Sequence, residues 1–569
     1  MTYQTYRLCR DKETIRRIRD EEKQYSLPHS VLTTGIDLFT FINQIIKECK
    51  SDYALICHDD VILPETIDTN VANCINSVNS YIGEENWGVI GNAGVEYLSK
   101  NIHTLLSDPH TTYLPPKYKN PVIAESLDGN TLLLNIKSLR EKEISLPKEI
   151  KGYHLYDLIL CSESYKKGLA CLISPWLYVI HSSSGNYKAF KKAIKEKDIQ
   201  NYFRESFSNH TITSINDNIP IFQDYEDLSS RKRTKKSFET IVDNLIKDIF
   251  KEKSGRLNII VRMHRESSKI IRLLRSINTL QSDLPKNIQI NVVLSINNIS
   301  KKEITPFVQR IKKEFSTISI TDIYLDNTNG RYPRVAALVN AVNHCYSINP
   351  NSYSWIVDYD DFVFPDIAKH LPYLLYKNEI IIGNSVVFNE KWDNLSEIPM
   401  KSKVQETYSS NLAEEIITGN NFLPICSVIY KTEILKDVFE SSKLQGDYYE
   451  DYAISLLTIP HYDNISTKIS FAGISYHGGN TVLKEDRTHW NYSYVTFLSE
   501  IINKGVLDKN TYQHLLTNNR HLLTHIAISN EFKGFKKGKI WKMLTIYRKL
   551  KRKLRHFIDR YTKGRVENR

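Results

Sequence analysis

Two apolar strands that end in acidic residues constrain the fold of this chain more than any other feature. The first is YALICHDDVIL, residues 53–63, and the second is YSWIVDYDDFVF, residues 353–364. An apolar run of this kind is buried in a sheet, whereas carboxylates avoid burial unless positive charge or hydrogen-bond donors meet them. The sequence therefore predicts two similar sites, each at the end of a buried strand.

Strands and amphipathic helices alternate around the second acidic strand. RLNIIVRMHRES (256–267) and IQINVVLSINN (288–298) are expected to be strands that end in loops, SKIIRLLRSINTL (268–280) a helix, and GRYPRVAALVNAVNHCY (330–346) a loop that enters a helix. This alternation is typical of a mostly parallel sheet with helices on both faces. Ligands of such sheets bind beyond the carboxyl ends of the strands, where both acidic clusters lie.

The N-terminal half contains the same kinds of element in a less regular pattern. Residues 1 to about 50 are expected to be mainly helical, with YQTYRLCR (3–10) as one remnant strand. Residues 153–168 are expected to form a helix that stops at Gly168, and a strand then runs into His181. The predicted fold class is therefore α/β, with two Rossmann-like domains in tandem and a basic, amphipathic helical tail. The expected divisions are 1–207 for the first domain, 208–255 for a linker that contains a helix, 256–500 for the second domain and 501–569 for the helical region with the tail.

Cysteine spacing and the N-terminal segment predict a cytoplasmic protein. The eight cysteines form no CxxC pair and several lie in apolar runs, so buried free thiols are expected and a zinc site is not. The charged N-terminal segment has no apolar signal core, and no apolar run reaches the ~18 residues that a membrane span needs.

Positive charge is concentrated near the C-terminus. Residues 533–569 contain 15 Lys and Arg against 2 Asp and Glu, a net charge of +13. Because the whole chain has a net charge of +11, the rest of the chain has a net charge of −2. This distribution argues against a general nucleic-acid-binding face. KIWKMLTIYRKLKRKLRHFIDRY, residues 539–561, has its apolar residues on one helix face, which predicts peripheral binding to the anionic inner face of the cell membrane. One alternative is a helix that packs this apolar stripe on the body of the protein, and another is a tail that binds nucleic acid.

The acidic cluster of the C-terminal half has the chemistry of a metal site. Asp358 and Asp360 alternate at a strand end, where their carboxylates can converge on one hard cation. Mg²⁺ or Mn²⁺ accepts such oxygen ligands and bridges them to a diphosphate. Taken alone, a capped strand end whose acids face water is an equal alternative.

Downstream residues favour a catalytic pocket over a capped strand end. GDYYEDYAISLL (446–457) places Glu450 and Asp451 before an apolar helix, and FAGISYHGGN (471–480) brings His477 out of a strand. A metal clamp would stabilise a departing nucleotide diphosphate, and a carboxylate would take the proton of an attacking hydroxyl. The histidine can complete the metal shell through a neutral imidazole nitrogen.

Residues 258–482 resemble a GT-A fold glycosyltransferase of the large family two. The matching segments, in order, are NIIVRMHRES, SWIVDYDDFVFPD, NNFLPICSVIYKTEIL and YYEDYAISLL. The resemblance implies that Asp358 and Asp360 bind diphosphate and metal, that Asp451 is the base and that His477 is a metal ligand. Glu450 is expected to orient Asp451 or an acceptor hydroxyl.

The same resemblance suggests how the nucleotide is held in the C-terminal half. Arg262 and Asn297 lie where family-two enzymes hold the base and ribose, although the usual acidic pair after the second strand is replaced by SINN. Arg331 and Arg334 are candidates for the phosphates, with a solvated loop as the alternative.

The N-terminal half resembles a family-two relative with His in place of the first Asp of the DXD motif. Further segments keep the family order: WGVIGNAGV, ESLDGNTLLLNIKS, YHLYDLILCSESYKKG and LYVIHSSSG. The resemblance implies that His58 and Asp60 take the motif positions and that Asp60 and the late His181 bind metal. Asp157 would then be the base, and Asp128 would lie on the acceptor side.

Two departures from the family pattern affect the N-terminal half. Ile159 replaces the second acid of the catalytic helix, and only about 50 residues precede the DXD-like strand, where two or more strands are usual. This short segment is compatible with three alternatives. The site binds its nucleotide weakly, it uses groups from another domain, or it is inactive.

The resemblance implies a tandem, inverting glycosyltransferase that uses Mn²⁺ or Mg²⁺. The donor would be a nucleotide-sugar, with a UDP-sugar favoured, and the acceptor a glycan or lipid-linked oligosaccharide of a bacterial capsule or lipopolysaccharide O-antigen. Two alternatives stay open. Only the second domain would be catalytic and the first a scaffold, or both sites would be degenerate and the protein would bind carbohydrate during assembly.

Overall fold

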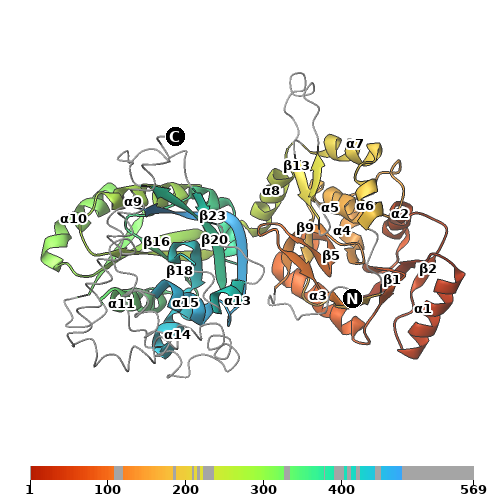
Figure 1. The fold of residues 1–569 in the computed structure, drawn as a ribbon, viewed down its shortest axis with the longest axis horizontal. Coiled ribbons are helices and arrows are strands. Elements are labelled where there is room, and N and C mark those ends of the chain that lie inside the picture. Colours follow the sequence, from red (N-terminus) through yellow and green to blue (C-terminus); the bar gives the residue numbers. More distant parts are fainter. Residues whose placement is uncertain are drawn as a thin grey trace, which may run out of the picture.

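A computed structural model gives the fold of the chain. It describes residues 2–107, 120–182, 187–207, 210–214, 218–221, 236–325, 333–376, 378–389, 403–405, 412–417, 423–442 and 450–476. The predicted basic tail, Arg331 and His477 lie outside these ranges. Figure 1 shows two lobes, each built around its own sheet, with the C-terminal lobe on the left.

The N-terminal half is a mixed α/β unit. Its sheet order is β2-β1-β3-β10-β5-β11-β9-β6-β7. The strands are β1 (Tyr3–Leu8), β2 (Val31–Thr33), β3 (Tyr53–His58), β4 (Val61–Ile62), β5 (Trp87–Gly91), β6 (Ala93–Glu96), β7 (Ile102–Thr104), β8 (Leu106–Ser107), β9 (Val122–Leu127), β10 (Thr131–Asn135), β11 (Ala170–Ile173) and β12 (Val179–His181). The helices are α1 (Lys12–Gln24), α2 (Leu38–Glu48), α3 (Ile67–Ile82), α4 (Ile136–Glu141), α5 (Tyr156–Lys166), α6 (Tyr187–Ala193) and α7 (Lys197–Ser206).

A short hairpin and one helix lie between the two sheets in sequence. They are β13 (His210–Thr213), β14 (Asn218–Ile221) and α8 (Phe238–Phe250). Ser237 caps α8 by accepting a hydrogen bond from the backbone N–H of Thr240, which places a helix within the predicted linker. The exact domain boundaries stay a prediction.

The C-terminal half follows the sheet order β17-β16-β15-β18-β22-β20-β23-β19. Its strands are β15 (Gly255–Met263), β16 (Ile288–Ile296), β17 (Ser319–Tyr324), β18 (Tyr353–Asp358), β19 (Phe362–Val363), β20 (Ile380–Asn389), β21 (Lys403–Gln405), β22 (Val428–Lys431) and β23 (Asn464–Tyr476). The α-helices are α9 (Lys269–Asp283), α10 (Lys301–Glu314), α11 (Pro333–Ile348), α12 (Leu371–Leu374), α13 (Leu412–Ile417), α14 (Thr432–Ser442) and α15 (Glu450–Thr458).

Both faces of the C-terminal sheet are covered. Successive residues of β15 point to opposite faces, so Ile259 packs in one apolar cluster with α9 and α10 while Ile260 packs in another with α11, α14 and α15. This two-sided burial explains why the strand sequences are continuous apolar runs, as parallel strands between helix layers require. The predicted α/β fold class is confirmed.

The two halves share one core topology. In each, a strand that ends at the DXD-like position pairs in parallel with the first strand of its half, β3 with β1 and β18 with β15. The next neighbours are antiparallel in both, β10 and then β5 in one half, β22 and then β20 in the other. Each sheet then returns to a parallel pair, β5 with β11 and β20 with β23. The two acidic strand ends therefore occupy equivalent places in two equivalent sheets.

The first 50 residues contain more sheet than the sequence predicts. Besides the anticipated strand β1, the three-residue strand β2 pairs in parallel with it. Thus two strands precede β3, whereas three, β15, β16 and β17, precede β18. β2 is partly exposed and too short to show an apolar pattern, and its pairing with β1 defines it instead.

Helix α8 packs against both halves of the protein. At its start, Phe238 lies edge-on to Tyr165 of α5 at 5.5 Å. At its end, Phe250 is fully buried against Tyr81 of α3 and Tyr373 of α12, at ring distances of 5.7 and 5.1 Å. Between them, Asp243 accepts a hydrogen bond from Tyr97 of the N-terminal half and forms an ion pair with Lys369 of the C-terminal half.

Replacing Phe250 with Ala should therefore destabilise the junction strongly. Removing a buried aromatic ring typically costs about 3–5 kcal/mol, since the cavity does not fully close. The thermal transition that includes α8 should fall by on the order of 10 °C in calorimetry. Asp248→Ala, at an exposed position of the same helix, serves as control and should shift it little. An unchanged transition in the Phe250 variant would contradict this role for α8.

The eight cysteines are all buried and free, as the sequence predicted. Within the described ranges, none of the helices has both the length and the apolar character that crossing a membrane requires.

Candidate active site

Equivalent elements build a polar site in each half. His58 is the last residue of β3 and Asp358 the last of β18, and a tight acidic turn follows each before β4 or β19. The facing helix begins at Tyr156 in one half and at Glu450 in the other. A strand end and a helix N-terminus thus meet at both sites, and the helix N-terminus favours negative charge there.

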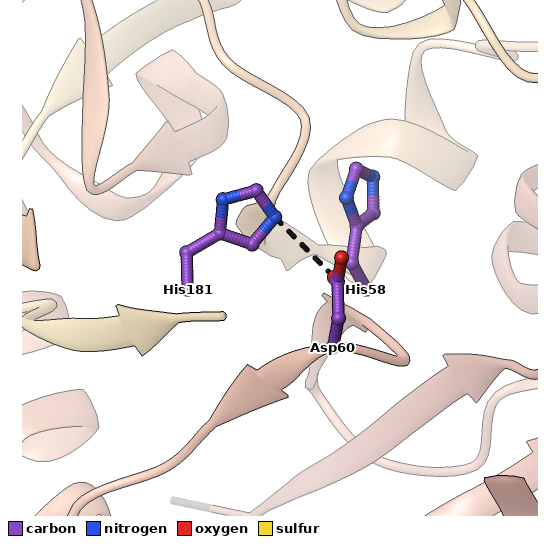
Figure 2. A group of neighbouring side chains, drawn as sticks. All are labelled: His58, Asp60 and His181. Carbon is purple, nitrogen blue, oxygen red and sulfur yellow. Dashed lines mark ion pairs between the residues drawn. The ribbon is translucent and has the colours of Figure 1, made fainter. Parts of the chain in front are cut away.

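Three side chains of the N-terminal half converge on one point. His58 comes from the end of β3, Asp60 from the turn after it and His181 from the end of β12 (Figure 2). One ligand atom from each lies within 4.8 Å of those of the other two. His181 Nε2 is 3.3 Å from Asp60 Oδ1, and the two imidazole rings are 6.0 Å apart between centroids. Among the described residues, this is the group of His, Cys, Asp and Glu that has metal-binding geometry.

The sheet register explains how residues about 120 positions apart meet. β12 pairs antiparallel with β4, and His181 lies opposite Val61, the residue directly after Asp60. The backbone N–H of Ser182 donates to the carbonyl of Asp60 at 3.0 Å and fixes this register. Because Asp60 and His181 come from adjoining strand ends, their side chains face one another.

Tyr156 holds His58 from the side opposite to the cluster. The Tyr156 hydroxyl is 2.7 Å from His58 Nε2 and donates to the carbonyl of Gly129 at 2.6 Å. Leu155, directly before Tyr156, adopts a left-handed backbone conformation with φ of 67°. A non-glycine residue rarely holds this conformation unless its surroundings enforce it, which marks the start of α5 as a constrained position.

Asp157, in the first turn of α5, is a carboxylate whose pKa is shifted toward neutrality. Its carboxylate receives hydrogen bonds from the backbone N–H groups of Gly129 and Leu158, each at 2.9 Å. Burial, followed by the nearby charge of Asp128, raises the pKa of Asp157 to about 7. Asp128 itself accepts hydrogen bonds from the backbone and side chain of Asn130. A carboxylate with a pKa near neutrality is matched to general-base catalysis.

The C-terminal site is organised around a buried arginine. Arg262, near the end of β15, is 8% exposed and binds Asp358 with two hydrogen bonds of 2.8 Å. Its Nη1 also contacts Glu450 at 2.8 Å and Asp451 at 3.3 Å. One guanidinium therefore joins the end of β18 to the start of α15.

The charges around Arg262 shift one another's protonation. Burial lowers the pKa of Arg262, but Asp358, Asp451 and Glu450 outweigh it and raise that pKa well above its usual value. Burial opposes ionisation of Asp358, yet Arg262 and Arg334 hold its pKa below the ordinary range. For Glu450, burial dominates and raises the pKa to about 7. This half therefore also has an acid that titrates near neutrality.

Other residues proposed for nucleotide binding border the same network. Arg334 on α11 pairs with Glu450 at 3.0 Å, which brings a second, partly exposed cation to the site. Asn297 follows β16 and is 3% exposed, and its side-chain Nδ2 has no hydrogen-bond partner among the described residues. An unmatched buried donor is costly, so this amide is suited to receive a ligand acceptor.

The acidic turn after β18 is tied to the sheet rather than left in solvent. Asp361 is buried and accepts a hydrogen bond from the backbone N–H of Ser475 on β23 at 3.0 Å. Burial, Asp360 and Asp358 raise the pKa of Asp361 well above its usual value. Arg272 donates to the backbone carbonyl of Asp360. Concentrated carboxylates of this kind favour a nearby cation.

The structure thus brings together most of the residues singled out from the sequence. His58, Asp60, His181, Asp128 and Asp157 gather in one half. Asp358, Arg262, Glu450, Asp451 and Arg334 gather in the other, with Asp360 in the adjoining turn. Sequence reasoning missed Tyr156 and Gly129, whose roles depend on contacts between distant segments.

Comparisons with known proteins give only distant structural matches. Neither a protein-family model nor a curated protein sequence matches the chain. A crystal structure of S. aureus TarS 1–349 in complex with UDP-GlcNAc matches with a TM-score of 0.32 and 17% identity, covering 47% of this chain and 72% of that one. The mannosyltransferase PcManGT from Pyrobaculum calidifontis, in complex with GDP-Man and Mn²⁺, matches with a TM-score of 0.30 and 14% identity, covering 52% and 84%. At this level of similarity the matches assign no activity to the chain.

Proposed function

We propose that the chain is a glycosyltransferase that moves sugars from nucleotide-sugar donors to a glycan acceptor, with one site in each half. The observation that carries the proposal is the N-terminal group of His58, Asp60 and His181 at the carboxyl end of β3. His58 contacts Tyr156, the residue directly before Asp157. A cation site and a nearby carboxylate base are suited to transfer from a sugar diphosphate. Its place at strand ends of an α/β sheet is the usual one for such ligands.

The residues of the N-terminal half fit a divalent cation. Two imidazoles and a carboxylate within 4.8 Å form a compact donor set. When bound, the cation would neutralise the diphosphate and stabilise its departure. Asp157 takes the proton of the attacking acceptor hydroxyl, and Asp128 borders the acceptor side. Direct attack by that hydroxyl inverts the configuration at the sugar carbon.

In the C-terminal half, we assign the base role to Asp451 and the orienting role to Glu450. Asp451 is 38% exposed in its side chain, whereas Glu450 is 6% exposed and held by Arg262. In this proposal Asp358 and Arg334 contact the donor, and Asn297 contacts its base or ribose. Asp360 and His477 are the proposed ligands of Mn²⁺ or Mg²⁺ here.

The proposed setting is the synthesis of a bacterial surface polysaccharide, a capsule or an O-antigen. The basic segment 539–561 would then bind the anionic inner surface of the cell membrane and bring the sites to a lipid-linked acceptor. The alternative in which one half only supports the other is decided by inactivating each site separately.

Asp60→Ala and Asp360→Ala test the proposal. The full chain is assayed for release of nucleoside diphosphate from a panel of UDP- and GDP-sugars, with Mn²⁺ and after its removal by EDTA. We expect EDTA to abolish turnover and each substitution to lower the turnover of its own half about 10²–10³-fold, since a metal contributes several kcal/mol at the leaving group. The control is Asp366→Ala, an exposed acid of the 3₁₀ turn Pro365–Lys369. Absence of nucleotide-sugar binding and turnover across the panel would refute the function.

A further inference from the structure

His58 is fixed on one side by Tyr156 and faces the cation cluster with the other. The ring nitrogen Nε2 lies 2.7 Å from the Tyr156 hydroxyl. Figure 2 shows the second ring nitrogen on the side of His181 and Asp60. The roles of the two nitrogens therefore depend on which of them carries the proton.

The hydrogen bonds of Tyr156 determine which nitrogen of His58 carries the proton. The carbonyl oxygen of Gly129 only accepts, so the single O–H of Tyr156 is donated to it, at 2.6 Å. The Tyr156 oxygen is then an acceptor toward His58, and Nε2 must supply the hydrogen. A neutral imidazole with its proton on Nε2 presents the lone pair of Nδ1, on the side where the cluster lies.

We propose that His58 is a third protein ligand of the cation in the N-terminal half, bound through Nδ1, and that Tyr156 is the positioning residue that sets its tautomer. The site then offers two imidazoles and one carboxylate. Such a donor set selects first-row transition ions such as Mn²⁺, Co²⁺ or Zn²⁺ over Mg²⁺ and Ca²⁺, which prefer all-oxygen shells. The inference deepens the proposed function, because it specifies the cation that this function invokes.

Gly129 supports the arrangement by its lack of a side chain. A Cβ at this position would lie 2.0 Å from the Tyr156 hydroxyl oxygen, which is much closer than two non-bonded heavy atoms can approach. Only glycine therefore lets the Tyr156 hydroxyl reach the Gly129 carbonyl. The same residue donates its backbone N–H to Asp157 at 2.9 Å. Gly129 therefore holds both Tyr156, which contacts His58, and the proposed base.

The C-terminal half has acids at the positions that correspond to His58 and Tyr156. Asp358 replaces His58 at the strand end, and Glu450 replaces Tyr156 at the helix start. There the two are joined through Arg262 instead of directly. The inferred preference for transition ions therefore belongs to the N-terminal half alone, and the two sites should differ in their metal requirement.

The test is metal binding by the full chain without any sugar nucleotide. Co²⁺ and Mg²⁺ are titrated by calorimetry, and electron spin echo modulation counts the imidazole nitrogens coupled to bound Mn²⁺. All proteins carry Asp360→Ala, which removes the proposed carboxylate ligand in the C-terminal half. We expect two coupled imidazoles, one in His58→Ala, and a preference for Co²⁺ over Mg²⁺ of at least tenfold.

Tyr156→Phe isolates the positioning role. It should weaken Co²⁺ binding about 10–100-fold, as loss of an outer partner of a metal-ligating histidine does. Tyr165→Phe is the matched control, since Tyr165 is another buried tyrosine of α5 whose hydroxyl donates to backbone carbonyls, and it should leave Co²⁺ affinity unchanged.

Two results would overturn the inference, and they differ from failure of the proposed function. If Mn²⁺ couples to one imidazole both before and after His58→Ala, the cation is bound by Asp60 and His181 alone, and the proposed function stands without the third ligand. If Tyr156→Phe and Tyr165→Phe bind Co²⁺ equally well, Tyr156 has no positioning role. Failure of the function itself appears instead in the nucleotide-sugar assays, whatever metal is bound.

Discussion

Asp157→Asn should abolish sugar transfer by the N-terminal half and remove a loss of stability that the wild-type protein shows between pH 4 and pH 8. A positioned general base typically contributes 10²–10⁴-fold to the rate, and asparagine keeps the shape of the side chain without its basicity. The loss should therefore appear in the turnover number, with little change in nucleotide-sugar binding. No rearrangement of the fold is needed to explain it.

The loss of wild-type stability with rising pH follows from the raised pKa of Asp157. Burial and Asp128 raise this pKa from 3.8 to about 7. Between these values the folded protein holds a proton that the unfolded chain has released, so stability falls as pH rises through this window. Asparagine does not ionise and avoids the loss. Because Asp157 is only partly buried, we expect the wild type to lose on the order of 1 kcal/mol relative to the variant between pH 4 and pH 8. The backbone hydrogen bond that asparagine cannot accept lowers the stability of the variant by the same amount at every pH.

Turnover and denaturation midpoints, measured from pH 5 to pH 9, check both effects. Asp157 becomes ionised as pH passes through about 7, and single turnovers of the wild-type N-terminal half, measured with Mn²⁺ present, should rise over the same range. Asp198→Asn, an exposed acid in the first turn of α7, is the control and should change neither quantity. A variant that keeps a tenth or more of the wild-type turnover would exclude Asp157 as the base.

Local sequence patterns predict the parts of the fold that depend on short-range regularity. The apolar strands β3 and β18, their acidic ends and helices such as α9 are all visible in the sequence because burial imposes a period of two or 3.6 on consecutive residues. The strand β2 is invisible by the same reasoning. It has three partly exposed residues, and only pairing with β1 makes it a strand.

The candidate sites were predictable in their residue types but not in their connections. The bond between His58 and Tyr156 spans 98 positions, and that between Arg262 and Glu450 spans 188. No local pattern encodes such contacts, since they depend on which strand ends the sheet order places together. A tyrosine before an aspartate, as at Tyr156, is therefore unremarkable in sequence and becomes informative only once Gly129 and His58 lie beside it.

Arg262→Met should destabilise the C-terminal half by about 3 kcal/mol at pH 8. Breaking a buried ion pair from one side leaves an uncompensated buried charge, which typically costs 3–5 kcal/mol. Here Glu450 bears most of that cost, because its side chain is 6% exposed and keeps only the partly exposed Arg334 as a partner. The side chains of Asp358 and Asp451 are 34% and 38% exposed and stay hydrated. We therefore expect the lower end of the range.

The deficit should shrink as the pH is lowered. Arg262 holds the pKa of Asp358 down, so this pair stabilises the fold above the unfolded pKa of 3.8 and the contribution is lost as pH falls through the depressed folded value. In the variant, Glu450, whose pKa is about 7 even beside two arginines, takes up a proton first, which removes the buried charge that only Arg334 still compensates. Urea denaturation at pH 8 and at pH 5.5 should show a smaller difference from wild type at the lower pH.

A second substitution separates the charge effect from simple loss of packing. If the charge of Glu450, left with Arg334 as its cation, is the cause, Arg262→Met combined with Glu450→Gln should recover more than half of the stability lost at pH 8, because the neutral amide needs no counterion. Arg310→Met is the control, since Arg310 and Glu266 form an exposed pair of the kind worth at most about 1 kcal/mol. If the variant loses the same free energy of unfolding at both pH values and the double variant recovers none of it, Arg262 acts by filling space. The contact between β18 and α15 would then not depend on charge.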